Sequence, residues 1–255
     1  MKLVTWNVNS IKVRLERLIA FLERESPDVV CLQELKCSND EFPHDVIEQA
    51  GYRAAVHGQK TYNGVAILTR DEPSAVRTGL GDESLDAHAR LIGAEVGGTR
   101  VLCGYFPNGG EVGAEKWVFK LAWMAALERY LRETEDLDAG LVLTGDFNVA
   151  PRDADVAKPE KWAESVLCHP DARGAYEQLV ALGLRDVFAE HHPAGGVFTW
   201  WDYRRLAFPK GDGLRIDLAL VTPALAERCV EARVDRDERK GKQPSDHAPV
   251  VYVFS

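Results

Sequence analysis

The chain of 255 residues is 45% hydrophobic and 28% charged, which is enough apolar material for a large core and enough charge for a well-solvated surface. Its formal net charge of −9 argues against a passive nucleic-acid-binding protein, because such proteins are usually basic. A metal-dependent nuclease remains compatible with this charge, since its site concentrates carboxylates that a cation offsets. No apolar run approaches the roughly 18 residues that a membrane-spanning helix needs, and no signal-peptide pattern follows Met1. We therefore expect a soluble cytoplasmic protein.

Runs typical of strands and amphipathic patterns typical of helices alternate along the chain. The expected strands cover residues 3–8, 29–32, 64–68, 91–96, 100–106, 141–147, 197–201, 214–221 and 250–254. The expected helices cover residues 11–25, with Ser10 as N-cap, 115–133 and 172–183. Gly97-Gly98 predicts a tight hairpin turn between two apolar runs. This mixture of βα units and hairpins favours two packed sheets with helices outside. Because no linker-like stretch divides the chain, we expect one domain over residues 1–255.

The five cysteines, at positions 31, 37, 103, 168 and 229, are scattered and odd in number. None of them forms a C-x-x-C pair. The pattern predicts buried free thiols in a reducing compartment rather than disulfides or a zinc site.

Polar side chains end or follow several of the expected strands. In "LVLTGDFNVAP", Asp146 and Asn148 stand two residues apart and therefore share one face of a strand. Comparable polar groups occur at Asn7, Asn9, Glu34, Tyr105, Asp217, Asp246 and His247. Each of these residues could instead have a purely local structural role, such as capping a turn. Asp217 is the exception, because it stands between apolar neighbours, where an ionised carboxylate is costly unless something binds it.

Together these residues offer carboxylates, carboxamides and one imidazole. An oxygen-rich set suits a hard cation such as Mg²⁺, and the absence of a Cys/His pattern argues against zinc. Sites of this composition cleave phosphate esters, because the cation neutralises the phosphate, a carboxylate activates water, and amide or imidazolium donors stabilise the pentavalent oxygens.

At these residues the sequence resembles the exonuclease III type of AP endonuclease, within the wider DNase I-like endonuclease/exonuclease/phosphatase superfamily. The resemblance is carried by "LVTWNVNSI", "PDVVCLQELK", "GQKTYNGVAILTR", "GYFPNG", "LTGDFNVAP", "TWWDYR", "GLRIDLALV" and "PSDHAPV". These stretches occur in family order from residue 3 to about residue 254, and the ordered set is far more specific than any one of them. The resemblance implies a four-layer α/β sandwich, in which two mixed sheets lie between helical layers and the active site lies among strand-end loops.

The same resemblance implies a metal site. Glu34 would be the principal ligand, with Asn7 beside it and Asp246 nearby. Asp146 and Asn148 could ligate a second ion, and the motifs leave open whether one or two ions act. The implied cofactor is Mg²⁺, with Mn²⁺ as a plausible substitute.

The implied catalytic residues are Tyr105, Asp146, Asn148, Asp217 and His247. Asp146 would orient and deprotonate the attacking water, while Asn148 and His247 would contact the scissile phosphate. Asp217 would orient His247 and favour its imidazolium form. Tyr105 would lie against the phosphate and the leaving group.

Expected contacts with double-stranded DNA follow from the resemblance as well. Trp200, Trp201, Leu214 and Ile216 match an apolar patch that receives a flipped abasic sugar or a frayed terminal nucleotide. Adjacent strand residues face opposite ways, so we expect only one of the two tryptophans, Trp200, to line this pocket. Candidate contacts with the DNA backbone are Tyr62, Asn63, Arg90, Asn108 and Lys116.

The implied function is a Mg²⁺-dependent DNA repair phosphodiesterase that cuts 5′ to abasic sites and trims 3′ ends. A bulky residue in the variable segment 161–173, such as Leu167, could exclude the abasic sugar and leave mainly a 3′-5′ exonuclease or 3′-phosphodiesterase. A lipid or inositol phosphodiesterase is disfavoured by "TWWDYR" and "GLRID", and a non-catalytic DNA-binding module by the intact polar set. We expect a monomer, without a predicted protein partner.

Two local features complete the pattern. Basic residues gather at Arg204-Arg205, Lys210, Arg215 and 236–242, although the last run is equally typical of a solvated loop. Ser10 occupies a position where members of the family often have glycine, which mainly alters the turn.

Overall fold

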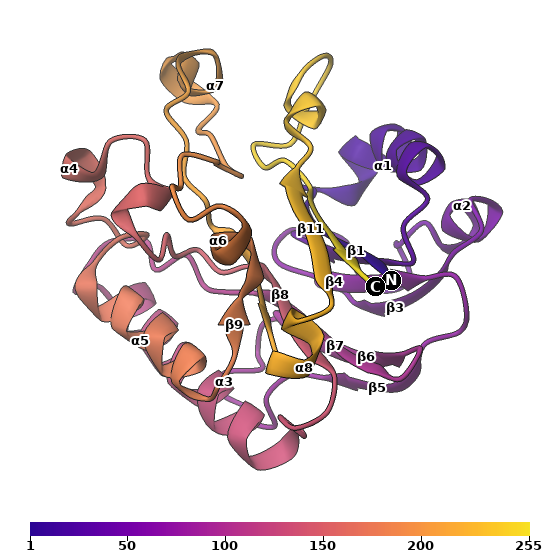
Figure 1. The fold of residues 1–255 in the computed structure, drawn as a ribbon. Helices are drawn as coiled ribbons and strands as arrows, with labels where there is room; N and C mark the ends of the chain where they lie inside the picture. The colour runs from indigo at the N-terminus through magenta and orange to yellow at the C-terminus, as the bar shows by residue number, and fades with distance from the viewer.

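The computed structural model describes residues 1–255 and contains two mixed six-stranded sheets. The first sheet has the order β11-β12-β1-β2-β4-β3, formed by Cys229–Val234, Val250–Phe254, Lys2–Asn7, Val29–Gln33, Val65–Thr69 and Arg53–His57. The second has the order β5-β6-β7-β8-β10-β9, formed by Ser74–Thr78, Leu91–Val96, Thr99–Tyr105, Leu141–Asp146, Asp217–Val221 and Arg185–Asp186. Only β1–β2 and β7–β8 pair in parallel. The two chain termini lie side by side (Figure 1).

Helices cover the outer faces of both sheets. The long ones are α1 (Ile11–Glu25), α3 (Glu115–Thr134) and α5 (Pro170–Ala181). Short α-helices are α2 (His44–Gln49), α4 (Pro159–Trp162), α6 (Val187–His191), α7 (Ala207–Lys210) and α8 (Pro223–Ala226), and 3₁₀ turns cover Asp153–Asp155, Arg204–Leu206 and Arg236–Arg239. The helices α4 and α7 lie at one end of the molecule, while α3 and α8 lie toward the other (Figure 1).

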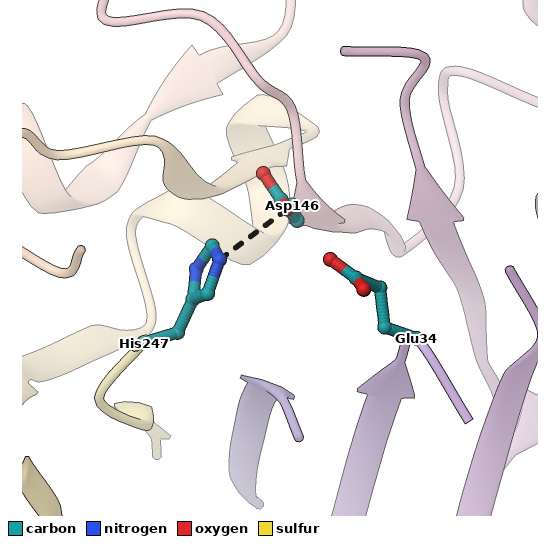
Figure 2. Close-up of side chains that lie close together, drawn as sticks. All are labelled: Glu34, Asp146 and His247. Atoms are coloured by element: carbon teal, nitrogen blue, oxygen red, sulfur yellow. Dashed lines mark ion pairs between the residues drawn. The ribbon is translucent and has the colours of Figure 1, made fainter. Parts of the chain in front are cut away.

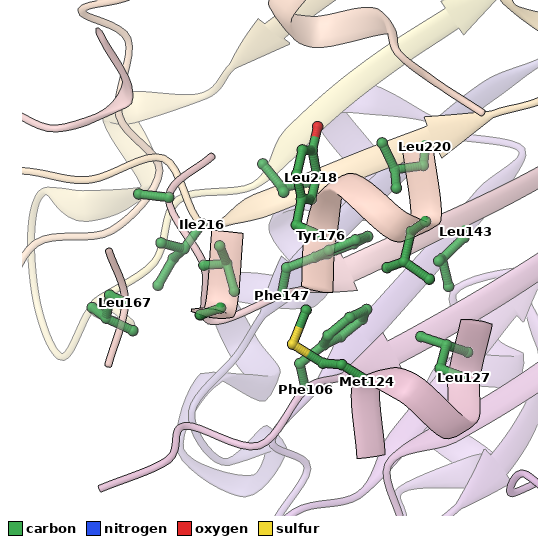
Figure 3. Packing of buried hydrophobic residues seen from close by; sticks show 14 of the residues in the cluster. Phe106, Met124, Leu127, Leu143, Phe147, Leu167, Tyr176, Ile216, Leu218 and Leu220 are labelled. Carbon is green, nitrogen blue, oxygen red and sulfur yellow. The ribbon is translucent and has the colours of Figure 1, made fainter. Parts of the chain in front are cut away.

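The alternation of side chains along the strands produces three apolar layers. In β1, Leu3 packs between the two sheets, whereas Val4 and Trp6 pack against α1. In β8, Val142 faces the first sheet and Leu143 faces the layer formed with α3 and α5 (Figure 3). The predicted four-layer α/β sandwich is confirmed.

Several local predictions are also confirmed. Gly97 and Gly98 both have positive φ in the turn that joins β6 to β7. The cysteines form no disulfide, and all but the partly exposed Cys229 are buried. No helix has the length and apolar character that crossing a membrane requires.

Two expected strands differ from the structure. The stretch 197–201 is not a strand, because only Trp200 makes isolated bridges, to Leu214 and His247. The run 214–221 pairs within the sheet only over its second half, as β10. Four strands (β3, β5, β9 and β11) and the five short α-helices (α2, α4, α6, α7 and α8) were not predicted. The edge strand β5 exposes every residue and therefore lacks a clear apolar alternation.

Ser10 stands at the N-cap of α1, as predicted, but its side chain makes no capping hydrogen bond. Its backbone has φ 88° and ψ 109°, a conformation that costs a non-glycine residue about 1–3 kcal/mol.

We therefore expect Ser10→Gly to stabilise the fold, because it relieves this strain and removes no hydrogen bond. The added freedom of glycine in the unfolded chain offsets part of the gain, which leaves about 1 kcal/mol, or a rise in Tm of about 2–4 °C. Thermal unfolding measures this, with Ser10→Ala as the control that keeps the strain. A Tm for the glycine variant at or below that of the alanine variant would contradict the prediction.

Candidate active site

The polar strand ends predicted from the sequence meet at one edge of the sandwich because of the strand register. In the first sheet, Asn7 lies opposite Gln33, the residue before Glu34. In the second sheet, Asp146 lies between Tyr105 on one neighbouring strand and Asp217 on the other. Each sheet thus contributes a carboxylate to the same place.

The side chain of Asn7 joins these two carboxylates. Its Nδ2 donates hydrogen bonds to Glu34 Oε1 and to Asp146 Oδ2, each at 2.9 Å. Its Oδ1 accepts the backbone N–H of Asn9, also at 2.9 Å. The amide of Asn7 therefore positions the carboxylates of Glu34 and Asp146. Because its Oδ1 already accepts a hydrogen bond, the role of Asn7 as a metal ligand stays a prediction.

Glu34, Asp146 and His247 offer ligand atoms that all lie within 4.8 Å of one another (Figure 2). The two carboxylates fit a hard cation. His247 fits such a cation less well, because hard cations prefer oxygen ligands and because its Nδ1 is paired with Asp217. Asp246 stands outside this cluster, and its carboxylate accepts hydrogen bonds from Asn9 Nδ2 at 2.9 Å and Trp200 Nε1 at 3.0 Å.

His247 lies between two buried carboxylates. Its Nδ1 is 2.9 Å from Asp217 Oδ2, and its Nε2 is 3.7 Å from Asp146 Oδ2. Burial lowers the pKa of His247, but Asp217 and then Asp146 outweigh it and raise the pKa to about 10. The pairing of Asp217 with His247 expected from the resemblance is present, and it accounts for a carboxylate with 0% exposure.

Burial, and to a lesser degree the charge of Asp217, raises the pKa of Asp146 to about 7, while His247 opposes the shift. A carboxylate with a pKa near neutrality is well matched to accept a proton from water. A cation bound beside it would favour the ionised form.

Asn148 occupies a constrained turn directly after β8. Its backbone has φ 49°, a left-handed conformation that asparagine tolerates better than most residues. Its N–H donates to Asp146 Oδ1, its Nδ2 donates to the Phe106 carbonyl, and its Oδ1 accepts from Asn108 Nδ2. These bonds fix the amide close to the Asp146 carboxylate.

Lys120 of α3 is a site residue that the sequence did not reveal. The side chain has 0% exposure and no carboxylate partner. Its Nζ donates to the carbonyl oxygens of Asn148 at 2.7 Å, Val166 at 2.5 Å and Asn108 at 3.2 Å. Burial lowers its pKa to about 7, yet three carbonyl acceptors match the three hydrogens of an ammonium. Lys120 therefore ties together three separate loops beside the site.

The structure brings all five expected DNA-backbone residues into one groove of about 560 Å³, which Tyr105 also lines. These residues are Tyr62, Asn63, Arg90, Asn108 and Lys116. The Arg90 guanidinium lies 5.0 Å from the centre of the Tyr105 ring. Burial, together with Glu34 and Asp146, holds the pKa of Tyr105 well above its usual value, so its phenol keeps its proton.

The expected apolar patch is only partly open. Trp200 is half-buried, whereas Trp201 is 1% exposed and packs against Phe208, which agrees with the choice of Trp200. Leu214 and Ile216 are 0% and 2% exposed and belong to the core beside α3 and α5. This burial does not favour direct contact with a nucleotide, and their role stays a prediction.

Leu167 is 5% exposed, and its role at the expected pocket stays a prediction. Its side chain belongs to the same core layer, close to Ile216 (Figure 3). In the segment 161–173, Trp162 contacts Trp200 instead, edge to face, with ring centres 5.8 Å apart. Trp162 is therefore the bulky residue of segment 161–173 that lies against Trp200.

Comparisons with known proteins agree with the fold. The profile of the endonuclease/exonuclease/phosphatase family matches residues 4–247. Exodeoxyribonuclease III of Haemophilus influenzae is 38% identical over all of both chains. An AP endonuclease from Archaeoglobus fulgidus superposes with a TM-score of 0.97 at 42% sequence identity. A 3′ phosphatase NExo from Neisseria, bound to a product DNA hairpin, superposes with a TM-score of 0.97 at 43% sequence identity. Each comparison covers 100% of this chain and 99% of the other chain. The chain belongs to the endonuclease/exonuclease/phosphatase family.

Replacing Lys120 by methionine should disorganise the loops around Asn148 while leaving the groove surface in place. We expect kcat to fall about 10- to 100-fold, since small displacements of reacting groups have effects of this size, and KM to change much less. Steady-state kinetics well below Tm separate the two constants. Lys120→Arg, which keeps a cationic donor, should recover part of kcat. Equal kcat values for Lys120→Met and the wild type would show that Lys120 only supports folding.

Proposed function

We propose that this protein is a Mg²⁺-dependent DNA repair phosphodiesterase that acts on double-stranded DNA, with AP endonuclease and 3′-5′ exonuclease or 3′-phosphodiesterase activity. The observation that carries the proposal is the convergence of Glu34, Asp146, Asp217 and His247 at the junction of the two sheets. Exodeoxyribonuclease III, an AP endonuclease and a 3′ phosphatase bound to DNA are similar to the chain over its full length, which supports DNA as the substrate.

The proposed mechanism assigns each step to a residue of this chain. Asp146 accepts the proton of the attacking water, for which its raised pKa suits it. The His247 imidazolium, held by Asp217, and the Asn148 amide donate to the phosphate oxygens as negative charge develops on them. Glu34 and Asp146 would hold the cation, which when bound supplies positive charge to the phosphate. Tyr105, which keeps its phenolic proton, donates toward the leaving group.

Asp146→Asn and His247→Ala should each lower kcat by a factor of about 10²–10⁴, because each removes a proton-transfer or charge-stabilising group. Cleavage of a labelled duplex with a recessed 3′ end measures the loss, and Tm confirms that each variant is folded.

EDTA should abolish cleavage and Mg²⁺ restore it, with Mn²⁺ as a partial or full substitute. Full turnover in EDTA would contradict the metal assignment.

A gel that compares two duplexes tests the substrate. One duplex carries an internal abasic site and the other a recessed 3′ end, both with Mg²⁺. Cleavage of at least one is expected. Cleavage of neither, with hydrolysis of a phosphoinositide instead, would favour a lipid phosphodiesterase of the same family.

A mainly 3′-directed enzyme is the second candidate, and the contact between Trp162 and Trp200 favours it. This contact places a second indole ring beside Trp200, the residue expected to receive an extruded abasic sugar. A recessed 3′ end cut much faster than the abasic site would support this narrower function.

The pH dependence of cleavage should change in Asp217→Asn. In the wild type the raised pKa keeps His247 protonated at neutral pH, and the proton leaves only as pH rises through about 10. Loss of the Asp217 charge lowers this pKa toward the ordinary histidine value, so the alkaline decline of kcat should move to lower pH. A pH–rate profile measures the shift, and an unchanged alkaline limb would show that imidazolium is not required.

A further inference from the structure

Thr199 is a buried residue of the "TWWDYR" stretch, and the proposed mechanism gives it no role. Its exposure of 0% means that it cannot touch a bound substrate. The next residue, Trp200, forms bridges with Leu214 on one side and with His247 on the other. Thr199 and Trp200 therefore connect the segment that leads into β10 with the segment that carries His247.

The hydroxyl oxygen of Thr199 accepts two backbone hydrogen bonds at the start of β10. The donors are the N–H groups of Ile216 and Asp217, each at 3.1 Å. A hydroxyl oxygen has two acceptor lone pairs, and both are used here. The hydroxyl hydrogen is directed at the carbonyl of Leu214, 3.5 Å away. The hydroxyl of Thr199 is thus fully occupied in holding the backbone around Asp217.

The pairing of the strands leaves the N–H of Asp217 without an acceptor. Between β8 and β10, the Phe147 N–H donates to the Ile216 carbonyl at 2.8 Å. Because hydrogen bonds alternate along antiparallel strands, the N–H of Asp217 points away from β8. The strand on the other side, β9, pairs only with Leu220 and Val221. Thr199 therefore supplies the acceptor that a longer β9 would have supplied.

The backbone of Thr199 holds the segment after His247. Its carbonyl accepts the Ala248 N–H at 2.7 Å, and its N–H donates to the Leu214 carbonyl at 2.9 Å. One residue thus fixes both backbones whose side chains form the ion pair of Asp217 with His247. In that pair the two carboxylate oxygens lie 2.9 and 3.1 Å from His247 Nδ1.

We propose that Thr199 is a positioning residue that fixes the Asp217 carboxylate on His247 Nδ1. His247 is the only hydrogen-bond partner of that carboxylate, so the backbone of Asp217 determines where the carboxylate lies. Small displacements of groups that act on the substrate lower reaction rates strongly. This inference rests on the proposed function and deepens it, because it assigns a residue that orients the proposed phosphate donor.

Thr199→Val tests the role of the hydroxyl, because it keeps the shape of the side chain and deprives two buried N–H groups of their acceptor. We expect kcat on the duplex with a recessed 3′ end to fall about 10- to 100-fold. KM should change much less, since no exposed residue is altered. Thr199→Ser keeps the hydroxyl and should recover most of kcat. Steady-state kinetics with Mg²⁺, well below the Tm of each variant, separate the two constants.

Thr222→Val is the matched control. Thr222 is 1% exposed, and its hydroxyl accepts the backbone N–H of Leu141 at 3.1 Å. Leu141 begins β8 and Asp146 ends it, so this hydroxyl holds the same two strands at the end away from the site. The control should lower Tm, as Thr199→Val does, but keep the kcat of the wild type.

A measurement without catalysis separates this inference from the proposed function. In EDTA and at one fixed pH, proton NMR detects the strongly deshielded proton of a buried imidazole Nδ1 that donates to a carboxylate. We expect this signal in the wild type, Thr199→Ser and Thr222→Val, and its loss or marked upfield shift in Thr199→Val. His247→Ala assigns the signal. If valine prevents folding, Thr199→Ala removes the same hydroxyl with less steric demand and should give the same two changes.

The outcomes separate the two proposals. An unshifted NMR signal in the variant without the hydroxyl, or equal kcat values for that variant and Thr222→Val, overturns the positioning role of Thr199. A shifted signal in that variant, in a series whose wild type cleaves neither test duplex, supports the positioning of Asp217 and overturns the proposed hydrolytic function instead.

Discussion

Asp146 and Asp217 lie directly opposite each other on β8 and β10, and both carboxylates are withdrawn from water. Two negative charges in such positions destabilise the folded protein unless positive charge and hydrogen bonds compensate for them. The imidazolium of His247 lies between them, and the amide of Asn7 donates to Asp146 Oδ2, the oxygen that faces His247. The site is thus arranged around the need to stabilise buried negative charge, which is also the condition under which a carboxylate becomes a useful base.

This compensation depends on the packing of one sheet against the other. Asn7 belongs to the first sheet and Asp146 to the second, and their hydrogen bond spans 139 residues of sequence. Ser245 strengthens the junction, because its hydroxyl donates to the Asn7 carbonyl at 2.7 Å and accepts the N–H of His247 at 3.2 Å. A sliding of the sheets would separate Asp146 from His247, so the apolar layers that fix the sheets also fix the geometry of the proposed site.

The features that could be predicted from the sequence are those that depend on local patterns and on motifs in a fixed order. The polar residues that end or follow strands, such as Asp146 and Asn148, were recognisable because they come after apolar runs. The expected shared strand face of these two residues is wrong, because β8 ends at Asp146 and Asn148 lies in a left-handed turn. Lys120 was not recognisable, because within the helical pattern of residues 115–133 a buried lysine looks the same as an exposed one, and only tertiary contacts supply its three carbonyls. The contact of Trp162 with Trp200 was not predicted for the same reason, since the segment that carries Trp162 has no regular period.

Several residues at and around the proposed site have a left-handed backbone conformation. Asn9, Glu34, Asn63 and Asn148 all have φ between 44° and 56°, although none of them is glycine. Such conformations are costly and persist only where the surrounding structure imposes them. Here the N–H of Ser10 donates to the Glu34 carbonyl, and Lys120 holds the Asn148 carbonyl. The cost of these turns is therefore met by contacts from helices and neighbouring strands, which leaves the side chains of Glu34 and Asn148 directed to the reacting centre before any substrate binds.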